Sequence, residues 1–430
     1  MMKKAILIFA IAMLLLAGCG QKQKTENDVT EVIFWQAMGG PLGDALAELI
    51  KKFNDTHPDI HVTSINMGNY TALSQKLMAS IQTGNQPHVA QAYEAWISNF
   101  IDGEVIIPIE DFIAKDPNFG KEELADIYPV FIKSNTMNGK LVSFPFNKSV
   151  RVQYYNKDIL FQNDLDPNIP PKTWEEFLHY SDLLTQDLDG DGKIDQYGTT
   201  LKISAWQFEN LLLQAGGEIM NEDNTKPLFN SKEGVEALEY LNTLLNVNKS
   251  AYLSPGYEGQ KDFTARKIAF YEDSSVSMAY MLRTGIDFNL GISAIPIKET
   301  KRNIISGTNV VIFDSENDKV EWAAWEFVKW FTEAAQTARW SELTYYMPVR
   351  KSAFQEEAIK KRLESNPEIA SVYEQLEHAT FEPQISEWFE TRKYLEEQVI
   401  EKVLRGTLKP QKALDNAAKM IKEKIAKSKE

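Results

Sequence analysis

Four aspartates gather in one short segment and could bind a metal ion. They occupy positions 1, 3, 5 and 9 of a loop with an EF-hand-like pattern: Asp187, Asp189, Asp191 and Asp195. Carboxylates at this spacing, with Gly192 at position 6 for the sharp turn, are typical of calcium ligands. Position 12 is Gly198, so the bidentate glutamate of the full pattern is missing. We predict a structural Ca²⁺ site here; the alternative is a polar turn whose carboxylates cap backbone amides.

The only cysteine, Cys19, offers a different chemistry. It follows Lys3, Lys4 and an apolar run from Ala5 to Leu16, which is too short to span a bilayer. This arrangement is typical of a bacterial lipoprotein signal, in which the thiol is acylated. We predict a signal peptide over residues 1–18, a tether over residues 19–30, and an extracytoplasmic protein that is lipid-anchored to the cell membrane through Cys19.

Aromatic side chains make up 11% of the chain and could pack against the C–H faces of a sugar. Four of them lie beside turns and polar residues, where ligand contact and core burial are both open: Trp35, Tyr70, Trp206 and Tyr346. Three others follow a helical pattern that is apolar nearly all round, which predicts burial in the core: Trp322, Trp325 and Trp330.

Motifs of several enzyme classes are missing from the sequence. There is no P-loop, no G-x-G-x-x-G, no G-x-S-x-G and no H-E-x-x-H. A pair of carboxylates for glycoside hydrolysis stays open, because such pairing is spatial and the chain has 61 acidic residues. We predict no catalytic residues and no cofactor for function, with a secreted carbohydrate-active hydrolase as the alternative.

The elements that must position these residues alternate between strand and helix. The apolar spacing predicts strands over 31–35 and 60–65 and helices over 42–53 and 73–81. This alternation is typical of an α/β fold with a mainly parallel sheet. Ligands of such sheets bind beyond the carboxyl ends of the strands, so residues just after Trp35, Ile65 and Tyr93 are candidates for ligand contact.

Composition limits the classes of partner. The 430 residues are 43% apolar and 25% charged, which is typical of a globular protein with two domains or lobes. The formal net charge is −15 and no long basic stretch interrupts it, so we expect no nucleic-acid partner. We expect a monomer without disulfides.

Short motifs along the whole chain carry a family resemblance: Phe34-Trp-Gln-Ala-Met-Gly39, Met67-Gly-Asn-Tyr70, Thr83-Gly-Asn85, Ala92-Tyr-Glu94, Pro145-Phe-Asn147, Tyr154-Tyr-Asn-Lys157, Pro171-Lys-Thr-Trp174 and Tyr346-Met-Pro348. With them the chain resembles the extracellular solute-binding proteins of ABC importers for sugars and glycerol phosphates, and within these the glycerol-3-phosphate-binding branch. The resemblance implies a periplasmic-binding-protein-like (type II) α/β fold, with two lobes of mainly parallel sheets joined by a multi-crossing hinge. The implied N-terminal lobe comprises 31–144 and 297–337, and the C-terminal lobe 145–296 and 338–430.

The resemblance also implies a set of ligand positions, to which Trp35 is added as an aromatic at a strand end: Tyr70, Glu94, Ser149, Trp206, Ser275, Gly307, Tyr346 and Arg392. Either Arg392 or Lys393 stands where the branch carries an arginine for phosphate. Lys148 replaces a small polar residue. A dianionic phosphate needs a bidentate arginine or several amides, so a solvent-facing Arg392 would favour a neutral sugar.

The resemblance therefore predicts a non-enzymatic receptor. It would capture a small polyhydroxylated or phosphorylated solute, such as a carbohydrate or a glycerol-3-phosphate-like molecule, in an interlobe cleft, and deliver it to ABC permease subunits in the membrane. Within the receptor class, a binder of neutral oligosaccharides is the alternative. A structural or adhesive lipoprotein is a further alternative.

Overall fold

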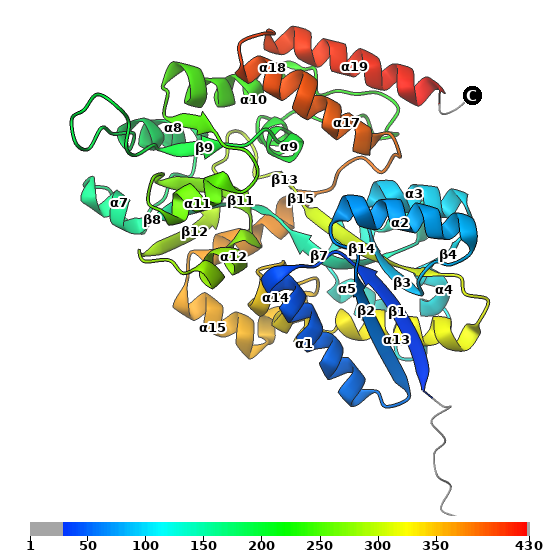
Figure 1. Cartoon of the computed structure of the whole chain (residues 1–430). Helices are drawn as coiled ribbons and strands as arrows, with labels where there is room; N and C mark the ends of the chain where they lie inside the picture. The colour runs from blue at the N-terminus through cyan, green and yellow to red at the C-terminus, as the bar shows by residue number, and fades with distance from the viewer. Residues whose placement is uncertain (1–28, 428–430) are drawn as a thin grey trace, which may run out of the picture.

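The computed structural model describes residues 29–427 and is drawn in Figure 1. The predicted signal peptide, Cys19 and most of the predicted tether lie outside the described residues. The strands are β1 (Thr30–Gln36), β2 (Ile60–Asn66), β3 (Val89–Ala92), β4 (Ile106–Ile107), β5 (Thr136–Met137), β6 (Lys140–Leu141), β7 (Phe144–Ser149), β8 (Arg151–Asn156), β9 (Thr199–Leu201), β10 (Ala251–Leu253), β11 (Phe270–Ser274), β12 (Leu290–Ala294), β13 (Asn303–Ile304), β14 (Ser306–Phe313) and β15 (Ala379–Thr380).

The principal helices are α1 (Gly40–Thr56), α2 (Tyr70–Thr83), α3 (Glu94–Asp102), α4 (Ile109–Ile113), α5 (Lys121–Asp126), α6 (Pro129–Ser134), α7 (Lys157–Gln162), α8 (Trp174–Leu183), α9 (Ala205–Gln214), α10 (Lys232–Asn242), α11 (Glu258–Thr264), α12 (Ser277–Thr284), α13 (Asp318–Phe331), α14 (Ala334–Thr344), α15 (Glu357–Ser365), α16 (Ile369–Glu374), α17 (Trp388–Tyr394), α18 (Glu401–Leu404) and α19 (Pro410–Lys427). A π-helical segment, Leu395–Ile400, joins α17 to α18.

The first sheet has the strand order β2-β1-β3-β14-β4, and β7 also pairs with β14. Strands β2, β1 and β3 are parallel, as the alternation of elements predicted, whereas β14 is antiparallel to β3, β4 and β7. One face packs against α1 and α13, where Phe34 of the sheet meets Phe327 of α13. The other face packs against α2 and α3 through residues such as Leu77 and Ile97.

The second sheet, β11-β8-β12, corrects the prediction of mainly parallel sheets. Both outer strands are antiparallel to β8. The reason is the route of the chain: β8 enters directly from β7 through Val150 alone, whereas β11 and β12 are separated by α12 and run in the same direction on either side of it. Apolar spacing predicts that these segments are strands but carries no information about their direction.

Figure 1 shows these sheets in two groups of elements, with α8 to α10 and α17 to α19 beside the second sheet. These helices share one apolar core. Strand β7 pairs with β14 of the first sheet as far as Ser149, so the change of sheet falls later than the predicted boundary after residue 144. The lobe boundaries themselves stay predictions.

The three tryptophans of the predicted apolar helix all lie in α13. Trp325 and Trp330 are buried as predicted, while Trp322 is half-buried against the same core. The side chain of Thr173 caps α8 by accepting a hydrogen bond from the amide of Glu176. Within the described residues, no helix is both long enough and apolar enough to cross a membrane.

Candidate ligand-binding cleft

Two cavities that share residues form the candidate site. The large cavity, of about 610 Å³, is lined by loops and helix ends of both groups of elements, including Gly39, Arg151, Trp206 and Tyr346. The small cavity, of about 480 Å³, is lined by Tyr93, Glu94, Glu382 and others. Three residues line both cavities: Tyr70, Arg392 and Glu396. The two cavities therefore form one cleft.

Five of the nine predicted ligand residues line this cleft. Tyr70, Trp206, Tyr346 and Arg392 line the large cavity, and Glu94 lines the small one. Tyr70 and Glu94 are the first residues of α2 and α3, which follow the parallel strands β2 and β3. Their positions agree with the expectation that ligands bind beyond the carboxyl ends of such strands. Whether these residues bind a ligand stays a prediction.

The other four predicted ligand residues do not line the cleft. Trp35 is half-buried against the core between the first sheet and α2 and α3. Ser149 pairs with Ser306 between β7 and β14, and Ser275 is buried behind Tyr154, whose hydroxyl donates to its carbonyl over 2.8 Å. The family resemblance implied Ser149, Ser275 and Gly307, and Trp35 was added for its place at a strand end. Neither source reveals which way a side chain faces.

Gly307, the fourth residue, has a backbone role instead. Its φ is +115°, and a Cβ atom built at this position would lie 1.8 Å from the carbonyl oxygen of Asn147. Only glycine therefore permits the close pairing of β14 with β7. That pairing holds Asn147, which belongs to the motif Pro145-Phe-Asn147, against the cleft residues Tyr70 and Tyr346.

Asn147 organises the two cleft tyrosines. Its Nδ2 donates to the hydroxyl oxygens of Tyr70 (2.9 Å) and Tyr346 (2.8 Å), and its Oδ1 accepts from the amide of Thr308 (3.0 Å). The hydroxyl of Tyr346 also donates to Sδ of Met38 over 3.9 Å, whereas the hydroxyl of Tyr70, which accepts from Asn147, keeps its O–H for another acceptor. Burial raises the pKa of Tyr70 to about 12 and that of Tyr346 well above its usual value. Both hydroxyls thus stay protonated donors at neutral pH.

Glu94 is held by two donors from neighbouring strands. Its Oε1 accepts from Nζ of Lys148 and from Nδ2 of Asn309, each over 3.0 Å. The side chain of Lys148 is only 1% exposed, and that of Glu94 is 17% exposed. Lys148, noted in the sequence as an unusual residue, thus neutralises Glu94 and is not itself available to an anion. Oε2 of Glu94 remains as an acceptor for a hydroxyl group.

Arg392 lies among carboxylates. Its Nη1 is 3.2 Å from a carboxylate oxygen of Glu382. Burial opposes the charge on Arg392, but Glu382 and Glu209 outweigh burial and raise the pKa of the guanidinium further. Burial raises the pKa of the fully buried Glu209 carboxyl well above its usual value, and the neighbouring Glu382 adds to this effect. Lys393 is largely exposed beside Glu397 and lines the small cavity but not the large one.

Arg151 is a second arginine in the large cavity, which the sequence analysis missed. Its guanidinium lies over the ring of Trp206, 5.6 Å from the ring centroid. Trp206 in turn donates from Nε1 to the carbonyl of Ile304 over 2.9 Å. The ring of Trp206, which lines the cavity, is therefore held in place by both contacts. The residue types of β8 indicate only a buried strand. They do not indicate that its first residue, Arg151, lines a cavity.

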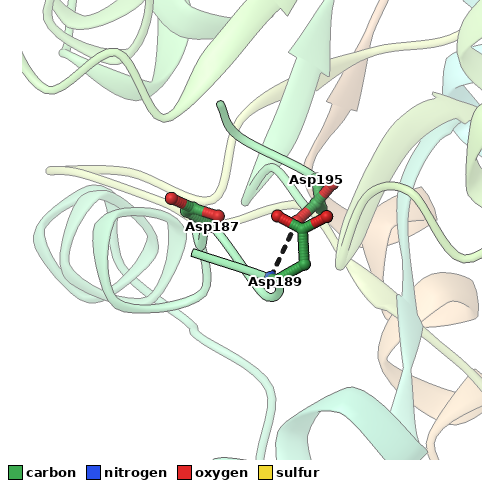
Figure 2. Close-up of side chains that lie close together, drawn as sticks. All are labelled: Asp187, Asp189 and Asp195. Atoms are coloured by element: carbon green, nitrogen blue, oxygen red, sulfur yellow. Dashed lines mark hydrogen bonds between the residues drawn. The ribbon is translucent and has the colours of Figure 1, made fainter. Parts of the chain in front are cut away.

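The acidic loop lies apart from the cleft. Figure 2 shows the carboxylates of Asp187, Asp189 and Asp195 facing one another, and one oxygen of each lies within 4.8 Å of the others. Asp187 accepts from the amides of Gly190 and Gly192, and Asp195 accepts from the amides of Leu188 and Asp189. The amide of Gly192 is the main cause that lowers the pKa of the Asp187 carboxyl.

Asp191, the fourth predicted calcium ligand, instead accepts from the amide and Nζ of Lys193. It is not part of the group of three facing carboxylates. Because the other aspartates cap backbone amides, the polar-turn alternative accounts for these contacts. Calcium binding stays a prediction.

A family model described as "Bacterial extracellular solute-binding protein" matches residues 48–370. The chain belongs to this family. The family's members bind solutes outside the cytoplasm, so the predicted class of solute-binding protein is confirmed at this level, and the hydrolase alternative gains no support.

Relatives and solved structures extend the family match over the whole fold. The sn-glycerol-3-phosphate-binding periplasmic protein UgpB of Escherichia coli (strain K12) is 28% identical over 415 residues, which cover 90% of this chain and 91% of the relative. The cyclic α-maltosyl-1,6-maltose binding protein from Arthrobacter globiformis is 25% identical, with a TM-score of 0.77 over 92% of this chain and 99% of that chain.

UgpB from Mycobacterium tuberculosis, solved in complex with glycerophosphocholine, is 21% identical and shares the fold, with a TM-score of 0.79 over 93% of this chain and 99% of that chain. These solute-binding family members share one architecture. The type II periplasmic-binding-protein fold that the resemblance implied is therefore confirmed.

Proposed function

We propose that this protein is the receptor of an ABC importer, and that it captures a small polyhydroxylated solute, a carbohydrate or a glycerol phosphate, in the cleft. The observation that carries the proposal is the combination of Tyr70, Tyr346 and Glu94 around connected cavities. Phenolic hydroxyls and one carboxylate acceptor match the hydroxyl groups of such a solute, and aromatic rings match its C–H groups. The glycerol-3-phosphate-binding relative supports this class of ligand.

The charge of the solute is a separate question. Arg392 faces the cleft, which favours a glycerol phosphate, because a guanidinium pairs well with phosphate. A neutral oligosaccharide is the second candidate. Glu382 favours this candidate, because its carboxylate already forms an ion pair with Arg392 at 3.2 Å. A dianionic ligand would have to replace that carboxylate.

Delivery would occur at the outer face of the membrane. Acylation of Cys19 would keep the receptor beside permease subunits, and the protein itself would carry out no catalysis. If so, Cys19→Ala will move the protein from the membrane fraction of its host to the soluble fraction. Retention of the variant in the membrane fraction would show that the anchor is misassigned.

Isothermal titration calorimetry of the purified mature protein tests the ligand class. The series comprises sn-glycerol-3-phosphate, glycerophosphocholine and maltotriose, each also incubated with the protein and examined for products. We expect at least one compound to bind and all to be recovered intact. Turnover of maltotriose would contradict the receptor function, and absence of binding by the whole series would contradict the proposed ligand class.

A further inference from the structure

One helix of the second group of elements, α12, contacts α1 of the first group beside the large cavity (Figure 1). The hydroxyl of Tyr280 in α12 donates to the carbonyl of Gly39 over 3.2 Å. Nη1 of Arg283, one turn further along, lies 3.0 Å from Oδ2 of Asp44 in α1. A Cβ atom built on Gly40 would lie 3.2 Å from the ring of Tyr280, so the ring packs directly on the start of α1.

The loop that carries Gly39 is fixed on the first sheet. The carbonyl of Met38 accepts from Nδ2 of Asn66 over 2.6 Å, and the amide of Ala37 donates to Oε1 of Gln91 over 2.7 Å. Asn66 is the last residue of β2, and Gln91 lies in β3. The loop and the start of α1 therefore move together with the first sheet.

Helix α12 is fixed on the second sheet in a similar way. The amide of Met278 donates to the hydroxyl oxygen of Tyr154 over 3.2 Å, and Tyr154 lies in β8, the central strand of that sheet. Met281 of the same helix is fully buried in the core. The contacts between α12 and α1 therefore depend on how the two sheets are placed relative to each other. Binding proteins with two lobes change that placement when they close around a ligand.

The ion pair between Arg283 and Asp44 lies outside both cavities, whereas Tyr280 lines the large one. The two charged side chains are 56% and 76% exposed. An exposed pair of this kind changes an equilibrium constant by a factor of about 2 to 5, and like charges at the same place repel by a similar amount. A substitution of this pair can therefore change closure without removing a contact to the solute.

We infer that the Arg283–Asp44 pair, together with the Tyr280 hydrogen bond beside it, is a closure latch that stabilises the closed arrangement of the two groups and so raises solute affinity. This inference rests on the proposed function, because closure matters only when a solute is captured. The affinity for a solute includes the free energy of closing, so contacts that form on closure contribute to it. Such contacts slow the release of the solute more than they change its entry.

The test reverses the charges of the ion pair in the mature protein, with Asp44→Arg, Arg283→Asp and the double variant. Asp287→Arg is the matched control, because Asp287 forms an exposed ion pair with Arg266 inside the second group. The probes are sn-glycerol-3-phosphate, glycerophosphocholine and maltotriose, and the variants are compared with the probe that the wild-type protein binds most tightly. Calorimetry measures affinity, stopped-flow tryptophan fluorescence measures release, and thermal unfolding checks that each fold is retained.

We expect each single reversal to weaken affinity about threefold to tenfold through faster release, and the double reversal to restore it to within about twofold of the wild-type value. Asp287→Arg should stay within about twofold of wild type. Wild-type affinity in both single reversals would overturn the inference alone, as would a double reversal that binds no better than the weaker single variant.

A loss of affinity that lies wholly in the association rate would also overturn the inference, because it would show that the charges act on the entry of the solute. If the wild-type protein binds none of the three probes, the proposed function is contradicted and the inference falls with it.

Discussion

The cleft is built from neutral groups in one part and from charged groups in another, and the two parts differ in how they are held. Tyr70, Tyr346 and Asn147 form hydrogen bonds between uncharged partners. Around Arg392, by contrast, Glu382 and the fully buried Glu209 bring carboxyl groups together. A neutral hydrogen bond contributes about 1 kcal/mol of net free energy, and loss of one partner costs about 1–3 kcal/mol, whereas an unpaired buried charge costs about 3–5 kcal/mol. The charged part should therefore couple binding to stability and pH, and the neutral part should not.

The largest effect is expected from a substitution of Glu94, which belongs to the charged part of the cleft through its ion pair with Lys148. Glu94→Ala removes a proposed ligand contact and leaves Lys148, at 1% exposure, without its carboxylate. We expect solute affinity to fall more than about 100-fold, and the free energy of unfolding to fall by about 3 kcal/mol. Calorimetry and urea denaturation measure these two quantities.

The double variant Glu94→Gln with Lys148→Met separates the two effects. Without either charge, the free energy of unfolding should return close to the wild-type value while solute affinity stays low. Full recovery of affinity in the double variant would show that Glu94 acts only by neutralising Lys148.

The next effect is a pH dependence of the free energy of unfolding, which we expect from the Glu209 carboxyl. Its pKa in the folded protein is raised, so between the unfolded value of about 4.3 and the raised value the folded state binds a proton that the unfolded state has lost. The free energy of unfolding should therefore fall as pH rises through this range. Glu209→Gln should be about 1–2 kcal/mol more stable than wild type at pH 8 and show a weaker pH dependence.

Denaturation at pH 5 and pH 8 measures this difference. Glu364→Gln, a change at an exposed residue, is the matched control and should follow the wild-type curve. Equal pH dependence in Glu209→Gln and wild type would place the titrating carboxyl elsewhere.

A smaller effect is expected in the neutral part. Tyr70→Phe removes one hydroxyl that Asn147 contacts, and leaves the ring in place. Solute affinity should fall about tenfold, which corresponds to about 1.4 kcal/mol, with no change in the pH dependence of binding. Tyr180→Phe, outside both cavities, is the control. A loss as large as that of Glu94→Ala would erase the proposed distinction between the two parts.

The smallest effect lies outside the cleft, at the acidic loop. If Asp187, Asp189 and Asp195 bind calcium, 1 mM Ca²⁺ should raise the melting temperature by a few degrees without changing solute affinity. Asp189→Asn should abolish this increase, and Asp191→Asn should reduce it less because Asp191 pairs with Lys193. An identical melting temperature with Ca²⁺ and with a chelator would leave the polar turn as the correct interpretation.

The sequence predicts those site residues that lie where a parallel strand leads into a helix. Tyr70 and Glu94 begin helices directly after parallel strands, a place that apolar spacing predicts. Arg151 and Asn147 lie in β8 and β7, where every residue is buried and neighbouring positions look alike from the sequence. The positions of these strands that face the cleft are set by the pairing of β7 with β14 and by the packing of Trp206. Long-range pairing of this kind leaves no local pattern.

The direct link between β7 and β8 has a consequence for how this protein can be altered. A single buried residue, Val150, separates the two strands. Inserting one residue there would turn the side chains of β8 to opposite faces and move Arg151 out of the large cavity. Length changes should abolish function at this link, and should cost far less in the exposed turn at Glu222 and Asp223. That segment is thus the place to insert a fluorescent reporter when the protein is developed into a sensor for its solute.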